Sequence, residues 1–453
     1  MGDTGGRVPP RRLAIALAAV PLVAAGLADA TIIVHRNTHT PPAAVSPHKV
    51  SPAPRARPVV PADVARNTAI RQLLAMRSDA VLHHNRAEWA SVLDPKSRAF
   101  RRRQLATFDN LRQVPLASWS YSLDTTATQA TTNRLLRYHA PVFAPMHFTL
   151  RYRLSGFDKR PTSLLQYPTF VRRGSRWFLA SLSDFASAGQ QSALDLWDFG
   201  PVAVYRQPRV LVLGHPDNIE VMHEVASEVA ADIPRVTAVW GSHWAQRAVV
   251  LVPDTQAELA RVVADAGDLT NIAAVATAEV QLGTGRPDPV GDRVGINPRN
   301  WPKLSPLGRQ IVLTHELTHV ATRAVTSGST PTWLAEGFAD YVGYLGSGVP
   351  TPFVAQDLGS AVRAGRVPST LPRNGEFDGA SKQLSQAYEG AWLACRLIVQ
   401  RFGQPALVRF YRVVGRAGER PSVAVADALQ RMFKLTPREF LAEWHGFLRA
   451  QLG

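Results

Sequence analysis

The residues whose types and spacing could do chemistry lie in one short segment, His315-Glu316-Leu317-Thr318-His319. On a helix, side chains four positions apart share one face, so the two imidazoles would project together, as adjacent zinc ligands must. Glu316 would lie about 100° round the helix from His315 and could lean toward a metal-bound water. An H-E-x-x-H string occurs by chance in a chain of this length only about once in a hundred cases. The spacing therefore predicts a zinc site on a helix.

A second segment supplies the carboxylates that such a site needs. Residues Pro331–Val342 follow a short Gly/Ser/Thr loop and predict a helix that packs back on the first. Glu336 can complete a His, His, Glu ligand set and leave the fourth position for water. Asp340, one turn further, can accept the free ring N–H of a ligating His. The alternative, two amphipathic helices with incidental His and Glu, would bury these polar groups at a high cost without a metal.

The segments H-E-L-T-H and T-W-L-A-E-G-F-A-D-Y resemble the gluzincin branch of clan MA metallopeptidases. The resemblance is to bacterial peptidase MA-like domains and, distantly, to aminopeptidase N and thermolysin. It covers residues 206–453 and is specific over 305–345. It implies zinc on His315, His319 and Glu336, catalysis by Glu316, and an outer carboxylate at Asp340.

The activity that the resemblance implies is hydrolysis of a peptide or protein substrate. Zinc would activate a water, and Glu316 would take its proton and pass it to the leaving amine. Tyr388 resembles the tyrosine with which gluzincins stabilise the oxyanion, and a helix-packing tyrosine is the alternative. The chain lacks the G-x-M-E-N motif of aminopeptidase N. Cleavage specificity, including endo- against exopeptidase action, stays open.

The elements around this segment predict a mixed α+β domain with a mainly helical C-terminal half. The first site helix should begin near Ser305-Pro306, where Ser can cap and Pro fits the first turn. Residues 293–297 form a short strand candidate, which could be an edge strand to which an extended substrate adds. The other expected elements are strands at 209–214 and 248–253 and helices at 218–233 and 255–263.

The pattern of residues 63–200 predicts a separate domain in which helices precede strands. Asp63 could cap the first helix, in which apolar residues recur at helical spacing from Ile70 to Val81, and helices are expected at 87–93 and 100–111. Strand candidates are 118–123, 147–154, 166–172 and 176–182. This order resembles the cystatin-like, nuclear-transport-factor-like cone fold. A packing or spacer role without chemistry is the simpler interpretation.

The N-terminal residues predict a membrane anchor, because Leu13–Val34 is a 22-residue apolar stretch interrupted only by Asp29. Arginines before it would hold the tail, within residues 1–36, in the cytoplasm. Residues 37–62 are a Pro-rich linker. The chain would then sit in the cell membrane as a single-pass protein with its catalytic part outside; a cleaved signal peptide and secretion are the alternative.

Much of the positive charge of the chain lies in residues 63–200. Lys and Arg number 51 against 35 Asp and Glu, a net charge of +16, and residues 63–200 alone hold 19 against 10. Abundant Arg and Ala are also typical of a GC-rich bacterial genome. An anionic lipid or wall polymer could meet the basic first domain, whereas no nucleic-acid-binding module is recognised.

The alternative to a peptidase is an envelope scaffold with a structural or vestigial zinc site. The single cysteine, Cys395, reads as a small buried residue.

Overall fold

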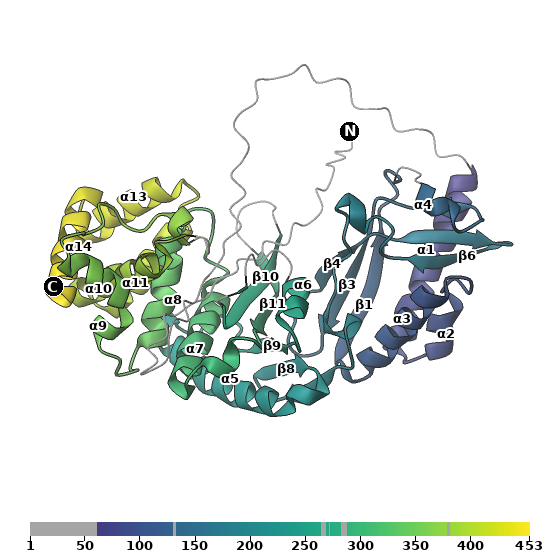
Figure 1. Cartoon of the computed structure of the whole chain (residues 1–453). Coiled ribbons are helices and arrows are strands. Elements are labelled where there is room, and N and C mark those ends of the chain that lie inside the picture. The colour runs from purple at the N-terminus through teal and green to yellow at the C-terminus, as the bar shows by residue number, and fades with distance from the viewer. Residues whose placement is uncertain (1–60, 130–132, 264–268, 271, 282–287, 378–380) are drawn as a thin grey trace, which may run out of the picture. The chain divides into compact units, whose positions relative to one another are not determined.

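The computed structural model, shown in Figure 1, describes residues 61–453 apart from 130–132, 264–268, 271, 282–287 and 378–380. The predicted anchor at 13–34 and nearly all of the predicted linker lie outside this part of the chain. Among the described residues, no helix combines the length and the apolar character that crossing a bilayer requires.

The chain divides into two compact units. The N-terminal unit holds the described residues up to 156 together with 161–201. The C-terminal unit holds 157–160 and 202–453. Each unit mixes helices and strands, so the chain as a whole is α+β.

The N-terminal unit begins with helices and continues with antiparallel strands in two three-stranded sheets, ordered β1-β3-β4 and β2-β5-β6. Aromatic side chains fill its interior, among them Trp89, Phe148 and Phe170, all of which are completely buried. Its elements are α1 (Pro61–Leu82), α2 (Arg86–Ser91), α3 (Arg98–Asn110), η1 (Leu111–Gln113), β1 (Leu116–Leu123), α4 (Asn133–Leu136), β2 (Val142–Phe143), β3 (Phe148–Leu154), β4 (Thr162–Gln166), β5 (Thr169–Arg173), β6 (Arg176–Ser181), η2 (Ala186–Ala188) and η3 (Leu196–Asp198).

Two sequence-based expectations for this unit are wrong in detail. The strand expected at 166–172 is two strands, because Pro168 lies between β4 and β5, which belong to different sheets. Proline has no backbone N–H to donate to a ladder, which favours a break there. Helix α1 begins at Pro61, so Asp63 lies in its first turn instead of capping it. The resemblance to a cone fold stays a prediction.

A five-stranded mixed sheet with the order β10-β11-β9-β8-β7 forms the base of the C-terminal unit. The central strands β8, β9 and β11 run parallel, and β7 and β10 pair antiparallel at the two edges. Strands β8 and β9 are buried along their whole length, as parallel strands covered on both faces usually are. The strands are β7 (Ala203–Arg206), β8 (Val210–Gly214), β9 (Ala248–Val252), β10 (Ala274–Gln281) and β11 (Asp288–Ile296).

The expected edge strand at 293–297 is wrong. Those residues belong mostly to β11, which lies inside the sheet between β9 and β10. The preceding strand folds back on β11 as an antiparallel hairpin partner and takes the edge position. Any strand added on this side of the sheet would therefore meet β10.

Helices cover the sheet and form most of the rest of this unit (Figure 1). One long helix, α5, connects β8 to β9, and α7 packs on α5, on β10 and on α8. The helices are η4 (Pro216–Asn218), α5 (Ile219–Trp240), α6 (Gln256–Val262), η5 (Trp301–Lys303), α7 (Pro306–Thr322), α8 (Thr332–Tyr344), α9 (Thr351–Val354), α10 (Gln356–Arg363), η6 (Asn374–Phe377), α11 (Leu384–Phe402), α12 (Gln404–Gly415), α13 (Pro421–Phe433) and α14 (Pro437–Leu452). Cys395 lies fully buried in α11.

Candidate metal centre

Helix α7 begins where the sequence predicts. Ser305 has an extended backbone, and its Oγ accepts the N–H of Gly308 at 3.1 Å. Pro306 occupies the first turn, where a missing N–H costs nothing. This start is followed by the predicted helix through His315 and His319, which share one face.

Helices α7 and α8 lie deep in the unit. Every residue from Ile311 to Thr322 is buried, as is every residue of α8. Gly337 lets α8 approach α11, since a Cβ there would lie only 2.2 Å from the carbonyl oxygen of Ala391. Gly343 does the same against α7, where a Cβ would be 3.0 Å from the Ile311 carbonyl. Small residues thus set how closely the helix that carries Glu336 lies to its neighbours.

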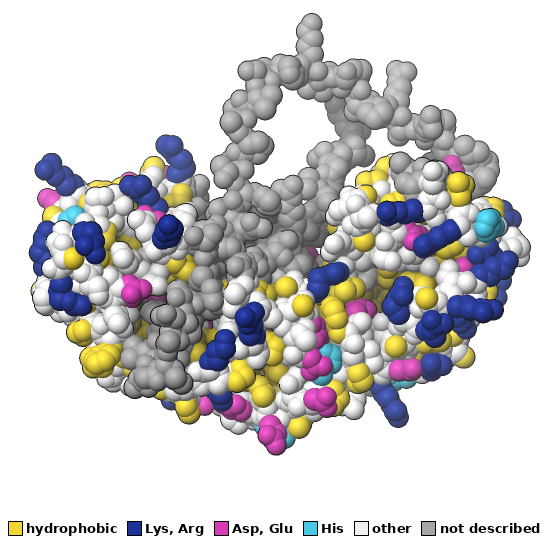
Figure 2. Space-filling model, viewed as in Figure 1, with side chains coloured by type: hydrophobic (Ala, Val, Ile, Leu, Met, Phe, Trp, Pro, Cys, Tyr) yellow, Lys and Arg dark blue, Asp and Glu magenta, His cyan; other side chains and the backbone are white. Residues whose placement is uncertain are grey.

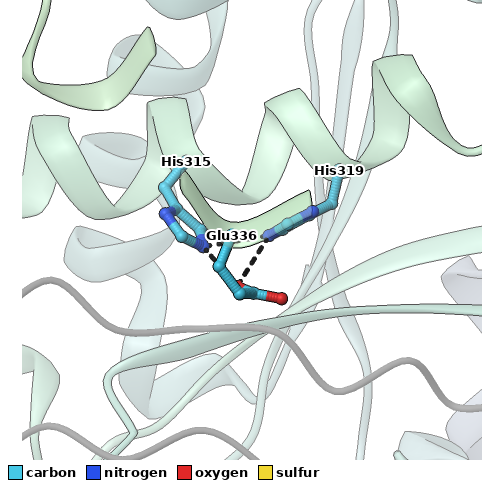
Figure 3. A group of neighbouring side chains, drawn as sticks. All are labelled: His315, His319 and Glu336. Carbon is cyan, nitrogen blue, oxygen red and sulfur yellow. Dashed lines mark hydrogen bonds and ion pairs between the residues drawn. The ribbon is translucent and has the colours of Figure 1, made fainter. Parts of the chain in front are cut away.

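Three predicted ligands come together between these helices, as Figure 3 shows. The Nε2 atoms of His315 and His319 are 2.9 Å apart. Glu336 Oε2 is 3.5 Å from the first and 3.6 Å from the second. The three donor atoms form a triangle whose centre is about 1.9 Å from each of them, close to the zinc–ligand distance of about 2.0–2.2 Å.

The surroundings of these atoms test whether the donor set suits a metal. The three side chains are at most 2% exposed, so water does not solvate them. Both carboxylate oxygens of Glu336 are buried, and among the described residues neither has a partner within hydrogen-bond distance, the two imidazoles lying slightly beyond it. A buried carboxylate is costly unless a cation compensates it, a part that the nearby His315 can play when protonated and that a bound metal ion would take over. Two imidazoles and one carboxylate are the ligand types of catalytic zinc sites, so the residues present fit a zinc ion.

Asp340 lies behind the first imidazole. Its Oδ1 is 2.8 Å from Nδ1 of His315, and both side chains are nearly fully buried. A carboxylate in this place keeps the proton on Nδ1, fixes the ring orientation and leaves Nε2 to face the donor triangle. The structure therefore brings Asp340 to the ring of His315, and its role as the outer carboxylate of a metal site stays a prediction.

The protonation states of the metal-free group follow from burial and from these contacts. Burial disfavours a charged His315, but the carboxylate of Asp340 outweighs it and raises the pKa of His315 to about 10. Burial lowers the pKa of His319 to about 4. Burial alone would raise the pKa of Glu336, but the two imidazoles hold it below its usual value. Near neutral pH, the metal-free group thus has a doubly protonated, cationic His315, a neutral His319 and an ionised Glu336.

Glu316 faces the sheet and is completely buried. Its Oε2 accepts the backbone N–H of Ala276, on the edge strand β10, at 2.7 Å. Its Oε1 is buried and accepts no hydrogen bond within the part of the chain that the structure describes. Burial raises the pKa of Glu316 well above the usual value for glutamate. One oxygen of Glu316 is therefore held in place by the backbone of β10, and a catalytic role for the other stays a prediction.

Tyr388 lies on α11, which packs against the helix that carries Glu336. Its side chain is 1% exposed, and its ring meets that of Phe377 edge-on with centroids 5.1 Å apart. This contact agrees with a packing role. Its role as an oxyanion donor stays a prediction.

One buried cation near the site was missed. Arg323 lies one turn beyond His319 and is 2% exposed. Its Nε donates to Asp292 Oδ1 at 3.2 Å, while its Nη2 is buried without a partner among the described residues. Its positive charge acts to lower the pKa of both Glu316 and His319. The signal was the spacing, since residues 315, 319 and 323 continue one helical face.

A second group of possible ligands is His215, Asp254 and Glu258. It follows β8 and β9 at the edge where both parallel strands end. His215 Nε2 is 2.5 Å from Glu258 Oε1, a hydrogen bond that already uses the ring nitrogen and the carboxylate. The other carboxylate oxygen of Glu258 accepts the Asp254 N–H at 3.0 Å. These hydrogen bonds explain why the three residues lie together at the start of helix α6.

Three other histidines of the C-terminal unit have ordinary surroundings. The ring of His223 contacts that of Tyr205 at a tilted angle of 46°, with ring centroids 4.2 Å apart. His445 Nε2 is 2.8 Å from the carbonyl oxygen of Pro368. Neither these two nor His243 belongs to a possible ligand group among the described residues.

Comparison with known proteins gives distant structural matches only. No protein-family model and no curated protein matches the chain. Among solved structures, a two-domain M1 zinc metallopeptidase mutant bound to L-arginine matches with 13% identity and a TM-score of 0.32, over 69% of this chain and 61% of that one. A mutant M1 zinc metallopeptidase from Deinococcus radiodurans matches with 14% identity and a TM-score of 0.31, over 74% of this chain and 70% of that one. The chain thus spans about 61% to 70% of the length of these proteins.

Proposed function

We propose that this protein is a zinc-dependent peptidase of the gluzincin type, with His315, His319 and Glu336 as the metal ligands. The observation that carries the proposal is the buried donor triangle, in which neither oxygen of Glu336 has a partner within hydrogen-bond distance among the residues that the structure describes. A structural zinc site closes with four protein ligands, whereas three leave a position for water. The three-ligand group and the adjacent Glu316 favour an enzyme over a scaffold.

In the proposed reaction the chain holds and moves one proton. A bound zinc ion would polarise the scissile carbonyl and lower the pKa of a coordinated water to about 7. The N–H of Ala276 fixes Oε2 of Glu316, so that Oε1 takes the proton of the attacking water and later gives it to the leaving amine. Asp340 keeps His315 oriented throughout.

The substrate backbone would lie along β10, the edge strand that also holds Glu316. Adding an extended peptide to a sheet edge satisfies its backbone groups without regard to its sequence. The developing oxyanion needs a donor, and the buried Nη2 of Arg323 joins Tyr388 as a candidate for that role. The proposed setting is the outer face of a bacterial membrane, with residues 13–34 as the anchor.

The decisive experiment compares Glu316→Gln with the wild-type chain. We expect the variant to bind about one zinc per chain but to lose at least about 100-fold in the cleavage of an unstructured protein, because general-base catalysis contributes about 10²–10⁴-fold. Zinc is measured by atomic absorption and cleavage by release of new amino termini.

The matched control is Glu389→Gln, which also changes a buried glutamate. Glu389 accepts the N–H groups of Asp357 and Leu358 on α10 and lies outside the donor group. This variant should keep zinc and turnover if it stays folded. Wild-type turnover by Glu316→Gln, or a wild-type chain that neither binds zinc nor cleaves, would refute the proposed function.

A further inference from the structure

The N-terminal unit contains a cavity of about 630 Å³ with a strongly basic wall. The start of α3, helix α4 and the ends of β5 and β6 contribute to it. Six of its lining residues carry a positive charge: Lys96, Arg98, Arg103, Arg134, Arg137 and Arg173. One acidic residue, Asp184, lines the same cavity. The sequence places a positive excess in this unit, and the structure shows where much of it gathers.

Two of the six cations are neutralised inside the unit. Arg173 donates from Nε and Nη2 to the two oxygens of Asp94, at 3.1 Å each. Arg137 pairs with Asp184. Asp184 also accepts the hydroxyls of Tyr138 and Thr169, at 2.7 Å each, so its oxygens are already engaged. The only acidic group of the wall therefore offers little compensation to the other cations.

Four cations remain, namely Lys96, Arg98, Arg103 and Arg134. All four side chains are exposed, and none pairs with a carboxylate within the described ranges of the chain. Figure 2 shows dark-blue side chains gathered over this unit. Like charges around one concave surface reinforce each other's potential and concentrate anions there.

The beginning of α3 adds to this positive potential. Residues 96–99 line the cavity at the start of this 13-residue helix. Ser97, at the N-cap position, makes no side-chain cap, and its hydroxyl donates to Asp94 Oδ2 at 2.8 Å. The first N–H groups of α3 thus keep the partial positive charge of a helix N-terminus.

We propose that this cavity is a binding site for a multiply charged phosphate group. Of these four cations Arg134 donates to the Ser187 hydroxyl and the Asp184 carbonyl, which leaves its charge unbalanced. A single carboxylate would balance one of the four charges, whereas a phosphate ester carries up to about two negative charges and a pyrophosphate more. Arginine forks match phosphate oxygens with paired hydrogen bonds, and three of the four cations are Arg. The volume admits a headgroup-sized ligand. The site is separate from the metal centre, and the inference does not depend on the proposed peptidase activity.

The first test is titration calorimetry of the full-length chain with inorganic pyrophosphate. We expect binding that weakens as salt is added, since the wall is open to solvent. Arg98→Gln and Arg103→Gln should each weaken binding at least about tenfold, as expected for the loss of a charge-assisted hydrogen bond. Arg102→Gln is the matched control, because Arg102 is the exposed neighbour of Arg103 on the same helix but does not line the cavity. It should bind pyrophosphate within about twofold of the wild type.

A second arm distinguishes the sources of the phosphate. Co-sedimentation with phosphatidylcholine vesicles that contain phosphatidic acid tests a lipid headgroup, and the Arg98→Gln and Arg103→Gln variants separate the cavity from any other membrane contact. If the wild type binds pyrophosphate but the two cavity variants bind vesicles as the wild type does, the ligand is a soluble phosphate. If the two cavity variants lose binding to both pyrophosphate and vesicles, the ligands include the lipid headgroup. Because all three arginines are exposed, unchanged melting curves would show that the variants stay folded. Absence of pyrophosphate binding, or equal loss in the Arg102→Gln and Arg103→Gln variants, would overturn the proposal.

Discussion

Replacing the carboxylate of the donor triangle tests the metal site most directly. In Glu336→Gln the side chain keeps its size but loses the charge that faces Nε2 of both His315 and His319 at 3.5 and 3.6 Å. Without metal, the variant loses this attraction and also the cost of burying a carboxylate. These terms oppose each other, so the stability of the metal-free protein should change by no more than about 1 kcal/mol.

The effect on zinc is much larger. Zinc binding to four-ligand sites is worth about 10–16 kcal/mol, so one ligand contributes roughly 3 kcal/mol, and its loss should weaken affinity by about 100-fold or more. At a zinc concentration 1,000 times the wild-type Kd, the metal stabilises the wild type by about 4.1 kcal/mol but the variant by only about 1.4 kcal/mol. That difference corresponds to a zinc-induced rise in Tm smaller by roughly 5–11 °C.

The assays are competition for zinc against a chromophoric chelator and thermal melts with and without zinc. Glu389→Gln, at another buried carboxylate that is 2% exposed, should keep the wild-type zinc affinity and the wild-type zinc-induced rise in Tm. If Glu336→Gln binds zinc as tightly as the wild type, or gains as much in Tm from zinc, then Glu336 is not a ligand and the reasoning from the donor triangle fails.

Three further predictions concern the same centre. Asp340→Asn should weaken zinc binding by about 10–100-fold while leaving the fold intact, because the ligands remain and only the orientation of His315 is loosened; an unchanged affinity in the chelator assay would contradict this. Gly337→Ala should destabilise the protein by about 1–3 kcal/mol in urea unfolding, since the new Cβ would overlap the Ala391 carbonyl, whereas Gly328→Ala, with open space around its Cβ, should unfold as the wild type does. Zinc affinity should rise by about tenfold per pH unit between about pH 6 and 8, because His315, with its pKa of about 10, is the one ligand that must release a proton. The raised pKa of His315 also stabilises the metal-free fold. This stabilisation is fully present below about pH 6.5 and is lost as the pH rises through about 10. A pH-independent affinity would mean that His315 is already neutral.

Local features were predictable where they depend on neighbouring residues. Ser305 and Pro306 mark the start of α7 because capping needs only a side chain and a backbone N–H three residues later. The strand expected at 166–172 failed for the opposite reason. Its residues suit a strand, but Pro168 lies between two strands that join different sheets, and strand pairing is a long-range choice.

The sheet edge could not be read from the sequence either. Residues 293–297 look like a strand, but whether a strand is internal or at an edge depends on which other strand pairs with it. The preceding hairpin strand, β10, covers β11 and becomes the edge. The Ala276 N–H that holds Glu316 belongs to that strand, so this contact was also invisible before the fold was known.

The sequence by itself determined which side chains share a face, since helix geometry fixes the separation of His315 and His319 whatever surrounds them. Only the tertiary structure decided that Glu336 Oε2 comes within 3.6 Å of both imidazoles and that no other donor reaches it among the described residues. It also decided that four arginine and lysine side chains of the N-terminal unit surround one cavity without acidic partners. The physical reason is that these arrangements depend on how closely separate elements pack, which small residues such as Gly337 permit but do not specify alone.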